Sequence, residues 1–426
     1  MPKRNGKHRF ILNLKELNKF IILNHFKMED YRTALKLIDK NYFMATIDLK
    51  DAYFLVPVAE SDRVYLRFYW NSELFRDRLF EFNVLPFGLC TAPYMFTKLL
   101  KPTLEYLRSL GYLSVNYIDD FLCIGDSFSN CLNNVETTKT LLKKLGFIIN
   151  NTKSNSEPNK VCTFLGFVFD SSKMCLTLPA EKRNRIKQLS NKFLNKKKCT
   201  IREFASYTGL LTSACPAVKY GWVYTKLLER EKFLALNYSN NYNKHMILPN
   251  NIKSDLIWWR DNIDHSLCSF QTDNYCLEIF SDASTTGWGV ACNNRTANGH
   301  WNYSQLLLHI NTLELLAAFY GLKIFASNLK NSNILLRIDN TTAIAYINKM
   351  GGIQFPHLNN IARDIWQWCE KRNLHLFASY IQSSKNVIAD SESRQAHNID
   401  TEWELAPYAF QQIIFSFERR IPSTRT

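Results

Sequence analysis

The sequence predicts a protein of the mixed α/β class (α+β) with more than one domain. A chain of 426 residues corresponds to about two to four domains of the usual size. Hydrophobic residues make up 46% of the chain, which is enough to bury sizeable cores. Runs of β-branched and aromatic residues, typical of strands, alternate with segments whose apolar residues recur at helical spacing. Both kinds of element are therefore expected.

The N-terminal segment is strongly basic and is expected to begin with a hairpin. Gly6 separates Lys3 and Arg4 from a strand-like stretch that starts at Arg9. This pattern predicts a short hairpin with cations at its tip. A solvated basic terminus is the alternative that composition alone favours.

Two segments place carboxylates beside strand-forming residues. Residues 45–54 read as an apolar strand that ends at Asp48, followed by a polar turn and two aromatic residues. Residues 115–124 hold Asp119 and Asp120 between two strand-forming runs. We expect these runs to pair as a hairpin whose turn is formed by the two carboxylates. An acidic tip that faces solvent is the alternative.

Three carboxylates at a strand end and a hairpin tip favour divalent cations. Adjacent like charges repel each other, and a pair of cations removes that repulsion. Hard cations such as Mg²⁺ prefer carboxylate oxygens and also bind substrate phosphates. In two-metal phosphoryl transfer, one ion activates the attacking oxygen and the other stabilises the leaving group. Asp48, Asp119 and Asp120 are therefore candidate catalytic residues and metal ligands.

Helical patterns follow the Asp-Asp segment. Apolar residues recur at helical spacing over 132–145, and Gly146 is a plausible C-terminal stop. Residues 181–198 hold eight lysines and arginines against one acid, above a narrow apolar stripe, which predicts a basic helix. A helix of this kind is usually a solvated surface helix. Thr200 and Glu203 have the spacing of a capping box for the next helix.

A second set of carboxylates occupies the C-terminal part of the chain. Asp282 ends an expected strand, and Glu314 lies in the first turn of an expected helix. Asp339 ends another apolar strand, and Asp390 follows later. Each of these acids alone is more often a cap or turn residue than a metal ligand. Whether the four act together depends on the resemblance described below, which implies that they hold two metal ions for cleavage of an RNA phosphodiester.

Bulk properties narrow the class of protein. The formal net charge of +15 favours a polyanionic partner. The 11 cysteines have no paired spacing, which argues against zinc sites and a disulfide framework and indicates core thiols in a reducing compartment. No apolar run approaches the roughly 20 residues of a membrane span, and no signal-peptide pattern is found. We expect an intracellular protein, cytoplasmic or nuclear and not secreted, with no membrane partner.

Four motifs in one order resemble those of retroelement reverse transcriptases. They are residues 48–53, 85–89, 117–120 and 164–166. The four carboxylates of the C-terminal part, in their strand, helix, strand, helix order, similarly resemble the ribonuclease H fold. The resemblance implies a right-hand polymerase with fingers, palm and thumb, followed by a ribonuclease H-like mixed-sheet domain.

The resemblance also implies domain limits. These are 1–178 for fingers and palm, 179–272 for thumb and connection, 273–396 for the ribonuclease H-like domain and 397–426 for a C-terminal tail. Family members have more fingers sequence before the first hairpin, so we expect an N-terminally short domain, from a fragment or a truncated reading frame.

Individual positions take expected roles from the resemblance. Lys3 or Arg4, with Arg9, matches the fingers hairpin that closes on the incoming triphosphate. Tyr53 matches the ring that excludes a 2′-hydroxyl, with a packed aromatic as the alternative, and Phe87 matches the segment beside the templating base and nucleotide. Lys153 matches a lysine near the leaving pyrophosphate, where a general acid and a surface lysine are both open.

Two features of the C-terminal part refine the expectation. The loop at residues 382–385 lacks the histidine or Pro-Gly turn of many relatives, so product release or turnover is expected to differ. Residues 311–314, 339–342, 351–352 and 402–405 look most like those of DIRS-type retroelements, which use a tyrosine recombinase.

The sequence thus predicts an RNA-directed DNA polymerase that uses dNTPs on an RNA and then a DNA template, joined to a ribonuclease H that cleaves RNA in RNA-DNA hybrids. The expected cofactor is Mg²⁺ or Mn²⁺, two ions per active site. The expected partners are an RNA template, a DNA primer and their hybrid. A decayed or domesticated fragment that only binds nucleic acid is the alternative. A DNA-templated polymerase fits the palm but not an attached hybrid nuclease.

Overall fold

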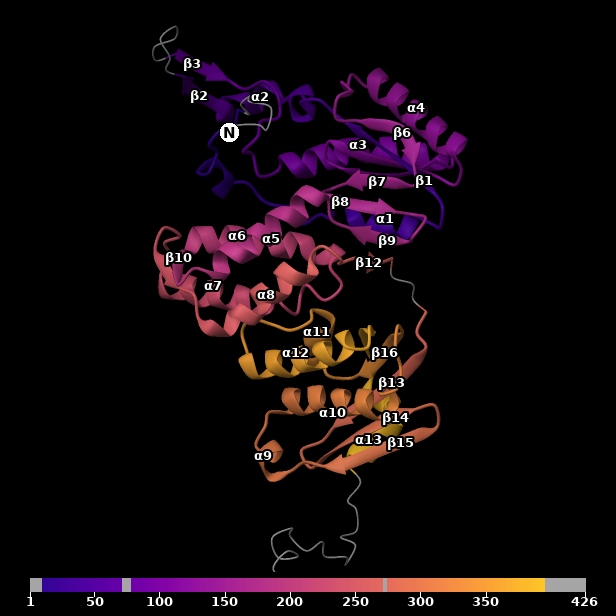
Figure 1. Cartoon of the computed structure of the whole chain (residues 1–426). Coiled ribbons are helices and arrows are strands. Elements are labelled where there is room, and N and C mark those ends of the chain that lie inside the picture. The colour runs from indigo at the N-terminus through magenta and orange to yellow at the C-terminus, as the bar shows by residue number, and fades with distance from the viewer. Residues whose placement is uncertain (1–9, 71–77, 271–273, 395–426) are drawn as a thin grey trace, which may run out of the picture. The chain divides into compact units, whose positions relative to one another are not determined.

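The computed structural model describes residues 10–70, 78–270 and 274–394. The expected triphosphate ligands Lys3, Arg4 and Arg9 lie outside the described residues, as does the C-terminal tail from residue 397. The chain divides into two compact units, Met1–Thr272 and Asp273–Thr426 (Figure 1). Both units combine sheets with helices, which confirms the mixed α/β class.

The centre of the first unit is a four-stranded sheet in the order β4-β5-β1-β6. Its strands are β1 (Phe43–Asp48), β4 (Leu113–Tyr117), β5 (Asp120–Gly125) and β6 (Asn155–Asn159). Two helices, α3 (Ala92–Ser109) and α4 (Phe128–Lys144), pack on it through one hydrophobic core. That core includes Ile47 and Phe121, and because side chains alternate along a strand, their neighbours Asp48 and Asp120 belong to the opposite face.

The helix expected over 132–145 is confirmed as α4. Gly146 follows it with φ +88° and donates its N–H to the carbonyl of Lys143, as a helix stop requires. Only part of the apolar stripe is buried, because Val135 is inside the core whereas Leu132 is 38% exposed.

The N-terminal part surrounds the sheet with short elements. They are η1 (Leu17–Lys19), α1 (Tyr31–Leu37), η2 (Ala52–Leu55), α2 (Glu60–Arg63), η3 (Val64–Leu66) and the antiparallel pair β2 (Arg67–Trp70) and β3 (Arg78–Glu81). A separate small core of Leu12, Leu14 and Leu66 joins the N-terminal segment to η3, and Phe68 of β2 packs against it. It brings the strand-like N-terminal segment next to the loop that follows β3, where Leu12 donates its N–H to the carbonyl of Phe87 at 2.9 Å.

A second four-stranded sheet has the order β12-β9-β8-β7. It consists of β7 (Val161–Phe164), β8 (Phe167–Asp170), β9 (Cys175–Thr177) and β12 (Cys268–Ser269). Leu165 and Gly166 connect β7 to β8 with φ of 50° and 76°. Two positive φ angles are the signature of a tight two-residue hairpin turn, so residues 164–166 form a hairpin tip.

Helices dominate the rest of the first unit. The elements are α5 (Ala180–Leu194), β10 (Lys198–Thr200), α6 (Ile201–Ala214), η4 (Cys215–Ala217), α7 (Lys226–Tyr238), β11 (His245–Ile247), η5 (Asn250–Ile252) and α8 (Lys253–Asn262). The basic helix was expected over 181–198, but α5 ends four residues earlier, at Leu194. Lys198 instead pairs with Ile247 in the β10–β11 ribbon. The Thr200 cap is confirmed, since its Oγ1 accepts the N–H of Glu203 at 3.2 Å.

The second unit has a five-stranded mixed sheet in the order β15-β14-β13-β16-β17. The strands are β13 (Leu277–Ala283), β14 (Gly287–Cys292), β15 (Arg295–His300), β16 (Asn333–Ile338) and β17 (His375–Tyr380), with β13, β16 and β17 parallel to one another. The helical elements are α9 (Tyr303–Leu306), α10 (Ile310–Phe325), α11 (Thr341–Asn348), α12 (Pro356–Glu370), η6 (Ser383–Lys385) and α13 (Val387–Arg394).

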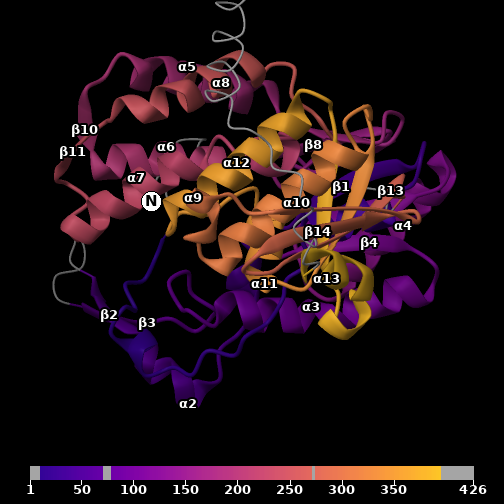
Figure 2. The same cartoon turned by 90° about the horizontal axis from the view of Figure 1, so that it is seen from below.

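Helices α10 and α13 lie on opposite faces of this sheet. Gly321 of α10 approaches the side chain of Val290, whereas the preceding strand residue, Gly289, lies against the backbone of α13. Alternation along β14 therefore puts the two helices on opposite faces. Figures 1 and 2 both show α13 beside β14. None of the helices that the structure describes combines the length and the apolar character that crossing a membrane requires.

Candidate active sites

The turn of the β4–β5 hairpin is formed by Ile118 and Asp119. The prediction that Asp119 and Asp120 form this turn is wrong by one residue, because Asp120 already pairs with Tyr117 as the first residue of β5. Ile118 has φ +55°, the left-handed region that a β-branched residue rarely adopts. Asn116 supports the turn by donating its amide to the carbonyl of Ile118 at 2.9 Å. The strained turn fixes where both carboxylates leave the backbone.

The register of β1 and β5 brings the first three predicted carboxylates to one end of the sheet. Asp48 and Asp120 are directly opposite each other in the antiparallel pair. The N–H of Leu49 donates to the carbonyl of Asp119 at 2.9 Å, which ties the turn to the end of β1. Burial, followed by the charges of Asp119 and Asp48, raises the pKa of Asp120 to about 6. Negative charge is thus concentrated at this end of the sheet, and the carboxylates raise one another's preference for the protonated form.

A loop after α4 supplies the polar partners of Asp48. Asn150 donates its Nδ2 to Asp48 Oδ1 at 2.6 Å, and Lys153 Nζ lies 3.4 Å from Asp48 Oδ2. The N–H of Asp48 donates to Ser154 Oγ at 3.0 Å. The sequence reasoning singled out Lys153 but missed Asn150 and Ser154. The only signal in the sequence was the run of turn-forming residues at 150–154.

Tyr53 and Phe87 line a cavity of about 300 Å³ that reaches Asp119. Their ring centroids are 5.0 Å apart, and Tyr53 is only 6% exposed. Gly88, also in the lining, has φ +114°, and a Cβ there would be 2.0 Å from the carbonyl oxygen of Leu12. Only glycine therefore fits this wall. The cavity combines a flat aromatic surface with a carboxylate at its edge.

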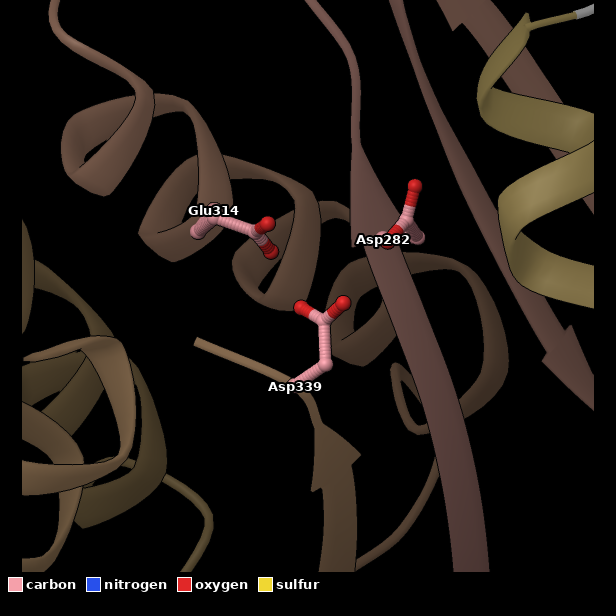
Figure 3. A group of neighbouring side chains, drawn as sticks. All are labelled: Asp282, Glu314 and Asp339. Carbon is pink, nitrogen blue, oxygen red and sulfur yellow. The ribbon is translucent and has the colours of Figure 1, made fainter. Parts of the chain in front are cut away.

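In the second unit, Asp282, Glu314 and Asp339 converge from β13, α10 and the end of β16 (Figure 3). Their ligand oxygens lie within 4.8 Å of one another, and no other group of three or more His, Cys, Asp or Glu side chains in the described ranges does so. The structure thus brings these three predicted residues together. It brings Asp48, Asp119 and Asp120 to one place without that close spacing of ligand atoms.

The electrostatics of this cluster fit a hard cation. Burial, with the charges of Asp282 and Asp339, raises the pKa of Glu314 to about 9. Glu314 Oε2 is buried without a hydrogen-bond partner. Three carboxylates that repel one another, one with an oxygen left unpaired, form the donor set that Mg²⁺ or Mn²⁺ prefers.

The fourth predicted acid of the second unit, Asp390, is not in this group of closely spaced oxygens, but its charge acts on the group: burial raises the pKa of Asp282, and the charges of Asp339 and Asp390 add to the rise. Asp390 is on α13, where Arg394 binds its carboxylate at 2.6 Å. Two serines that the sequence reasoning did not identify as partners contact the cluster itself. Ser383 donates to Asp339 Oδ2 at 2.7 Å, and Ser393 donates to Asp282 Oδ2 at 2.6 Å. Ser383 belongs to the loop that lacks the expected histidine.

Several cations of α5, and Lys196 just after it, have partners within the protein. Lys192 and Lys196 both bind Glu203 Oε1, at 2.8 and 2.7 Å. Lys182 donates to the carbonyl of Ser213 at 3.0 Å, and Lys187 forms an ion pair with Asp264. Glu203, expected to complete a capping box, instead joins the end of α5 to α6. A large part of the positive charge of α5 therefore stabilises the helical region itself.

The amino-acid sequence matches known proteins over most of its length. Residues 1–169 match the family model of reverse transcriptase (RNA-dependent DNA polymerase). The enzymatic polyprotein of cauliflower mosaic virus (strain CM-1841) is 23% identical over 422 residues, which cover 94% of this chain and 57% of the relative. The Gag-Pol polyprotein of avian reticuloendotheliosis virus is 26% identical over 209 residues, or 48% of this chain and 18% of the relative. The chain spans little more than half of the cauliflower mosaic virus polyprotein.

Solved structures share the fold at low sequence identity. The foamy viral protease-reverse transcriptase in complex with RNA/DNA hybrid has a TM-score of 0.55 at 17% identity, covering 96% of this chain and 52% of that one. The same kind of protein in complex with dsDNA has a TM-score of 0.53 at 17% identity, covering 90% of this chain and 76% of that one. The likeness is consistent with the expected order of a polymerase domain followed by a ribonuclease H-like domain.

Proposed function

We propose that this chain is an RNA-directed DNA polymerase joined to a ribonuclease H. In this proposal, residues 1–169 form a reverse transcriptase domain of the kind found in retroelement and retroviral polyproteins. It copies an RNA template, and then a DNA template, from dNTPs by extending a DNA primer. Its second unit cleaves the RNA strand of the RNA-DNA hybrid. The relatives that support the proposal are themselves longer polyproteins, and the matched solved structures are of complexes with dsDNA or with RNA/DNA hybrid.

The polymerase site consists of Asp48, Asp119 and Asp120, with the cavity beside them as the place of the incoming nucleotide. The primer 3′-hydroxyl attacks the α-phosphate of the dNTP. Tyr53 supports the sugar and excludes a 2′-hydroxyl, a role that its buried ring in the cavity wall supports. Phe87 forms the apolar surface beside the templating base.

Cations from two places meet the triphosphate in this proposal. Lys153, 66% exposed and 3.4 Å from Asp48, is placed to meet the leaving pyrophosphate. Lys3, Arg4 and Arg9 bind the triphosphate from the N-terminal hairpin. Positive charge stabilises the charge that develops on the leaving group.

Mg²⁺ or Mn²⁺, two ions per site, is the proposed cofactor. Asp48, Asp119 and Asp120 hold the ions in the first unit. Asp282, Glu314, Asp339 and Asp390 hold them in the second. Bound cations activate the attacking oxygen and stabilise the leaving oxygen in this kind of reaction. The observation in favour is chemical: burial and neighbouring carboxylates raise the pKa of Asp120 in the first site and of Glu314 in the second.

In the nuclease, the carboxylates orient a water molecule against the RNA phosphodiester. Ser383 and Ser393 orient Asp339 and Asp282 for this task through their hydroxyl groups. We expect cleavage without the usual loop histidine, with altered turnover, because the carboxylates and not that histidine define the site.

The proposal includes the domain limits 1–178, 179–272 and 273–396, with a tail at 397–426. It also includes a DIRS-type origin, which rests on the motifs at 311–314, 339–342, 351–352 and 402–405. An intracellular location, cytoplasmic or nuclear, is also part of it, since the 11 free thiols suit a reducing compartment.

The pairing of Asp48 with Asp120 at the end of one sheet, beside Asp119 in the turn, is the observation that supports the polymerase most directly. The test is extension of a labelled DNA primer on an RNA template by the purified chain with dNTPs and Mg²⁺. We expect full-length product that depends on the cation. Hybrid binding without extension would support the alternative, a decayed fragment that only binds nucleic acid.

A further inference from the structure

Helix α13 places a buried hydroxyl on one of the nuclease carboxylates. Ser393 Oγ donates to Asp282 Oδ2 at 2.6 Å. Ser393 is 2% exposed and Asp282 5% exposed, so water does not compete for this hydrogen bond. An ionised carboxylate that leaves water depends on such donors, because the desolvation penalty is otherwise uncompensated.

The hydroxyl has two acceptors within reach but only one proton. The carbonyl of Asp390 lies 2.9 Å from Ser393 Oγ, against 2.6 Å for Asp282 Oδ2. A carboxylate is the stronger acceptor, since hydrogen bonds to ionised groups are shorter and roughly twice as strong. The Ser393 hydroxyl therefore donates its hydrogen bond to Asp282, and this hydrogen bond orients one oxygen of the Asp282 carboxylate.

Two glycines of β14 let α13 come this close. A Cβ at Gly289 would lie 2.3 Å from the carbonyl oxygen of Ala389 and 2.4 Å from the nitrogen of Ser393. A Cβ at Gly287 would lie 3.2 Å from the carbonyl oxygen of Ser393. The backbone of α13 thus rests directly on the strand, without an intervening side chain.

Polar contacts fix the helix in that position. Ser284 Oγ donates to the carbonyl of Ser393 at 2.6 Å, and Asn386 Nδ2 donates to the carbonyl of Ser281 at 3.1 Å. Asn298 donates to the carboxylate of Glu392. The residue before α13 is therefore tied to β13, and the C-terminal end of the helix is tied to the turn after β13 and to β15, which holds the Ser393 side chain beside Asp282.

We propose that Ser393 is a positioning residue of the nuclease site, whose hydroxyl holds the carboxylate of Asp282 in the orientation that binds the divalent cation. The proposal rests on the proposed nuclease function of the second unit. Ser393 acts through Asp282, to which its hydroxyl donates. Outer contacts of this kind typically change metal affinity or activity about 10- to 100-fold when they are removed.

The test compares Ser393→Ala with the wild-type chain and with Ser391→Ala, the same change at an exposed position of the same helix. Mg²⁺ binding is measured by titration calorimetry. The binding heat assigned to this site is the heat that the wild-type chain shows and Asp282→Asn does not. We expect Ser393→Ala to weaken this binding about 10- to 100-fold, and Ser391→Ala to leave it unchanged. The rate constant kcat for hybrid cleavage should fall with it, while KM for the hybrid stays the same.

Two further measurements separate positioning from misfolding. Primer extension by the same Ser393→Ala preparation should be unchanged, which shows that the first unit is folded, and a cooperative thermal unfolding transition like that of the wild type shows that the second unit is folded. Ser393→Cys keeps a similar size with a weaker donor, so its Mg²⁺ affinity should lie between those of the wild type and Ser393→Ala.

The outcomes are distinct. Wild-type Mg²⁺ affinity in Ser393→Ala would overturn the positioning role while leaving the proposed function intact, and so would a change confined to KM. Weakened Mg²⁺ binding in a chain that never cleaves hybrid would support the positioning role and count against the nuclease. Absence of any heat that Asp282→Asn removes would overturn both.

Discussion

Asn150 donates a 2.6 Å hydrogen bond to Asp48, across 102 residues of sequence, and so connects the loop after α4 to the end of β1. The same loop receives the N–H of Asp48 at Ser154 Oγ. Asp48 is 9% exposed, so few water molecules reach it. The loop therefore determines how the Asp48 carboxylate is oriented toward Asp120.

From this contact we predict that Asn150→Ala slows primer extension about 10- to 100-fold, because Asp48 loses the donor that orients it. The measurement is single-nucleotide incorporation under saturating dNTP. Asn151→Ala, the same change at the exposed neighbour, serves as the control and should behave as wild type. Equal rates for the two variants would remove Asn150 from the polymerase site.

Tyr53→Val should raise the incorporation of ribonucleotides relative to deoxynucleotides, because it removes the ring at the cavity wall. Tyr53→Phe keeps the ring and its contact with Phe87, so its preference should match the wild type. Competition between rNTP and dNTP on one template measures the ratio. An unchanged ratio in Tyr53→Val would reduce Tyr53 to a packing residue of the core.

The raised pKa of Glu314 predicts a pH-dependent stability in the metal-free protein. In the unfolded chain this carboxyl ionises near its usual pKa of 4.5, whereas in the folded chain it ionises only near 9. The folded state therefore binds the extra proton between these values, and the free energy of unfolding falls as the pH rises from about 4.5 to 9.

Denaturant unfolding with a chelator present, at pH 5 and pH 8, checks this prediction. Glu314→Gln cannot titrate, so it should gain stability relative to the wild type as the pH rises from 5 to 8. If the difference in the free energy of unfolding between Glu314→Gln and the wild type did not vary with pH, Glu314 would keep an ordinary pKa in the folded protein.

Gly289→Ala should destabilise the second unit by about 1–3 kcal/mol and abolish most hybrid cleavage, because the added Cβ collides with the backbone of α13. Thermal unfolding and hybrid cleavage measure the two effects. Gly209→Ala, where no atom lies within 4 Å of the added Cβ, is the control for unfolding and should not destabilise. Normal cleavage by Gly289→Ala would show that α13 can shift without consequence for the site.

The sequence was sufficient to predict the fold class and the strands that deliver carboxylates. An apolar run that ends in an acid is visible in the sequence at Asp48, Asp282 and Asp339. The local composition indicates both the buried strand and the residue at which it ends. The hairpin turn was off by one residue because Ile118 adopts φ +55°, against the local preference of a β-branched residue.

Contacts between distant segments could not be predicted from local patterns. The hydrogen bond from Ser393 to Asp282 joins residues 111 apart, and its existence depends on how closely α13 packs on β14. The basic helix shows the same limit. Its local pattern indicates a solvated surface helix, and nothing in it shows that Lys192 and Lys196 both bind Glu203.

The central claim is that one chain contains two independent carboxylate sites, one for each reaction. Extension of a labelled DNA primer on RNA and cleavage of labelled RNA in a hybrid, measured on the same preparations with Mg²⁺, test it most directly. We predict that the wild-type chain does both, that Asp119→Asn loses only extension, and that Asp282→Asn loses only cleavage. Loss of both activities in either variant would contradict the account.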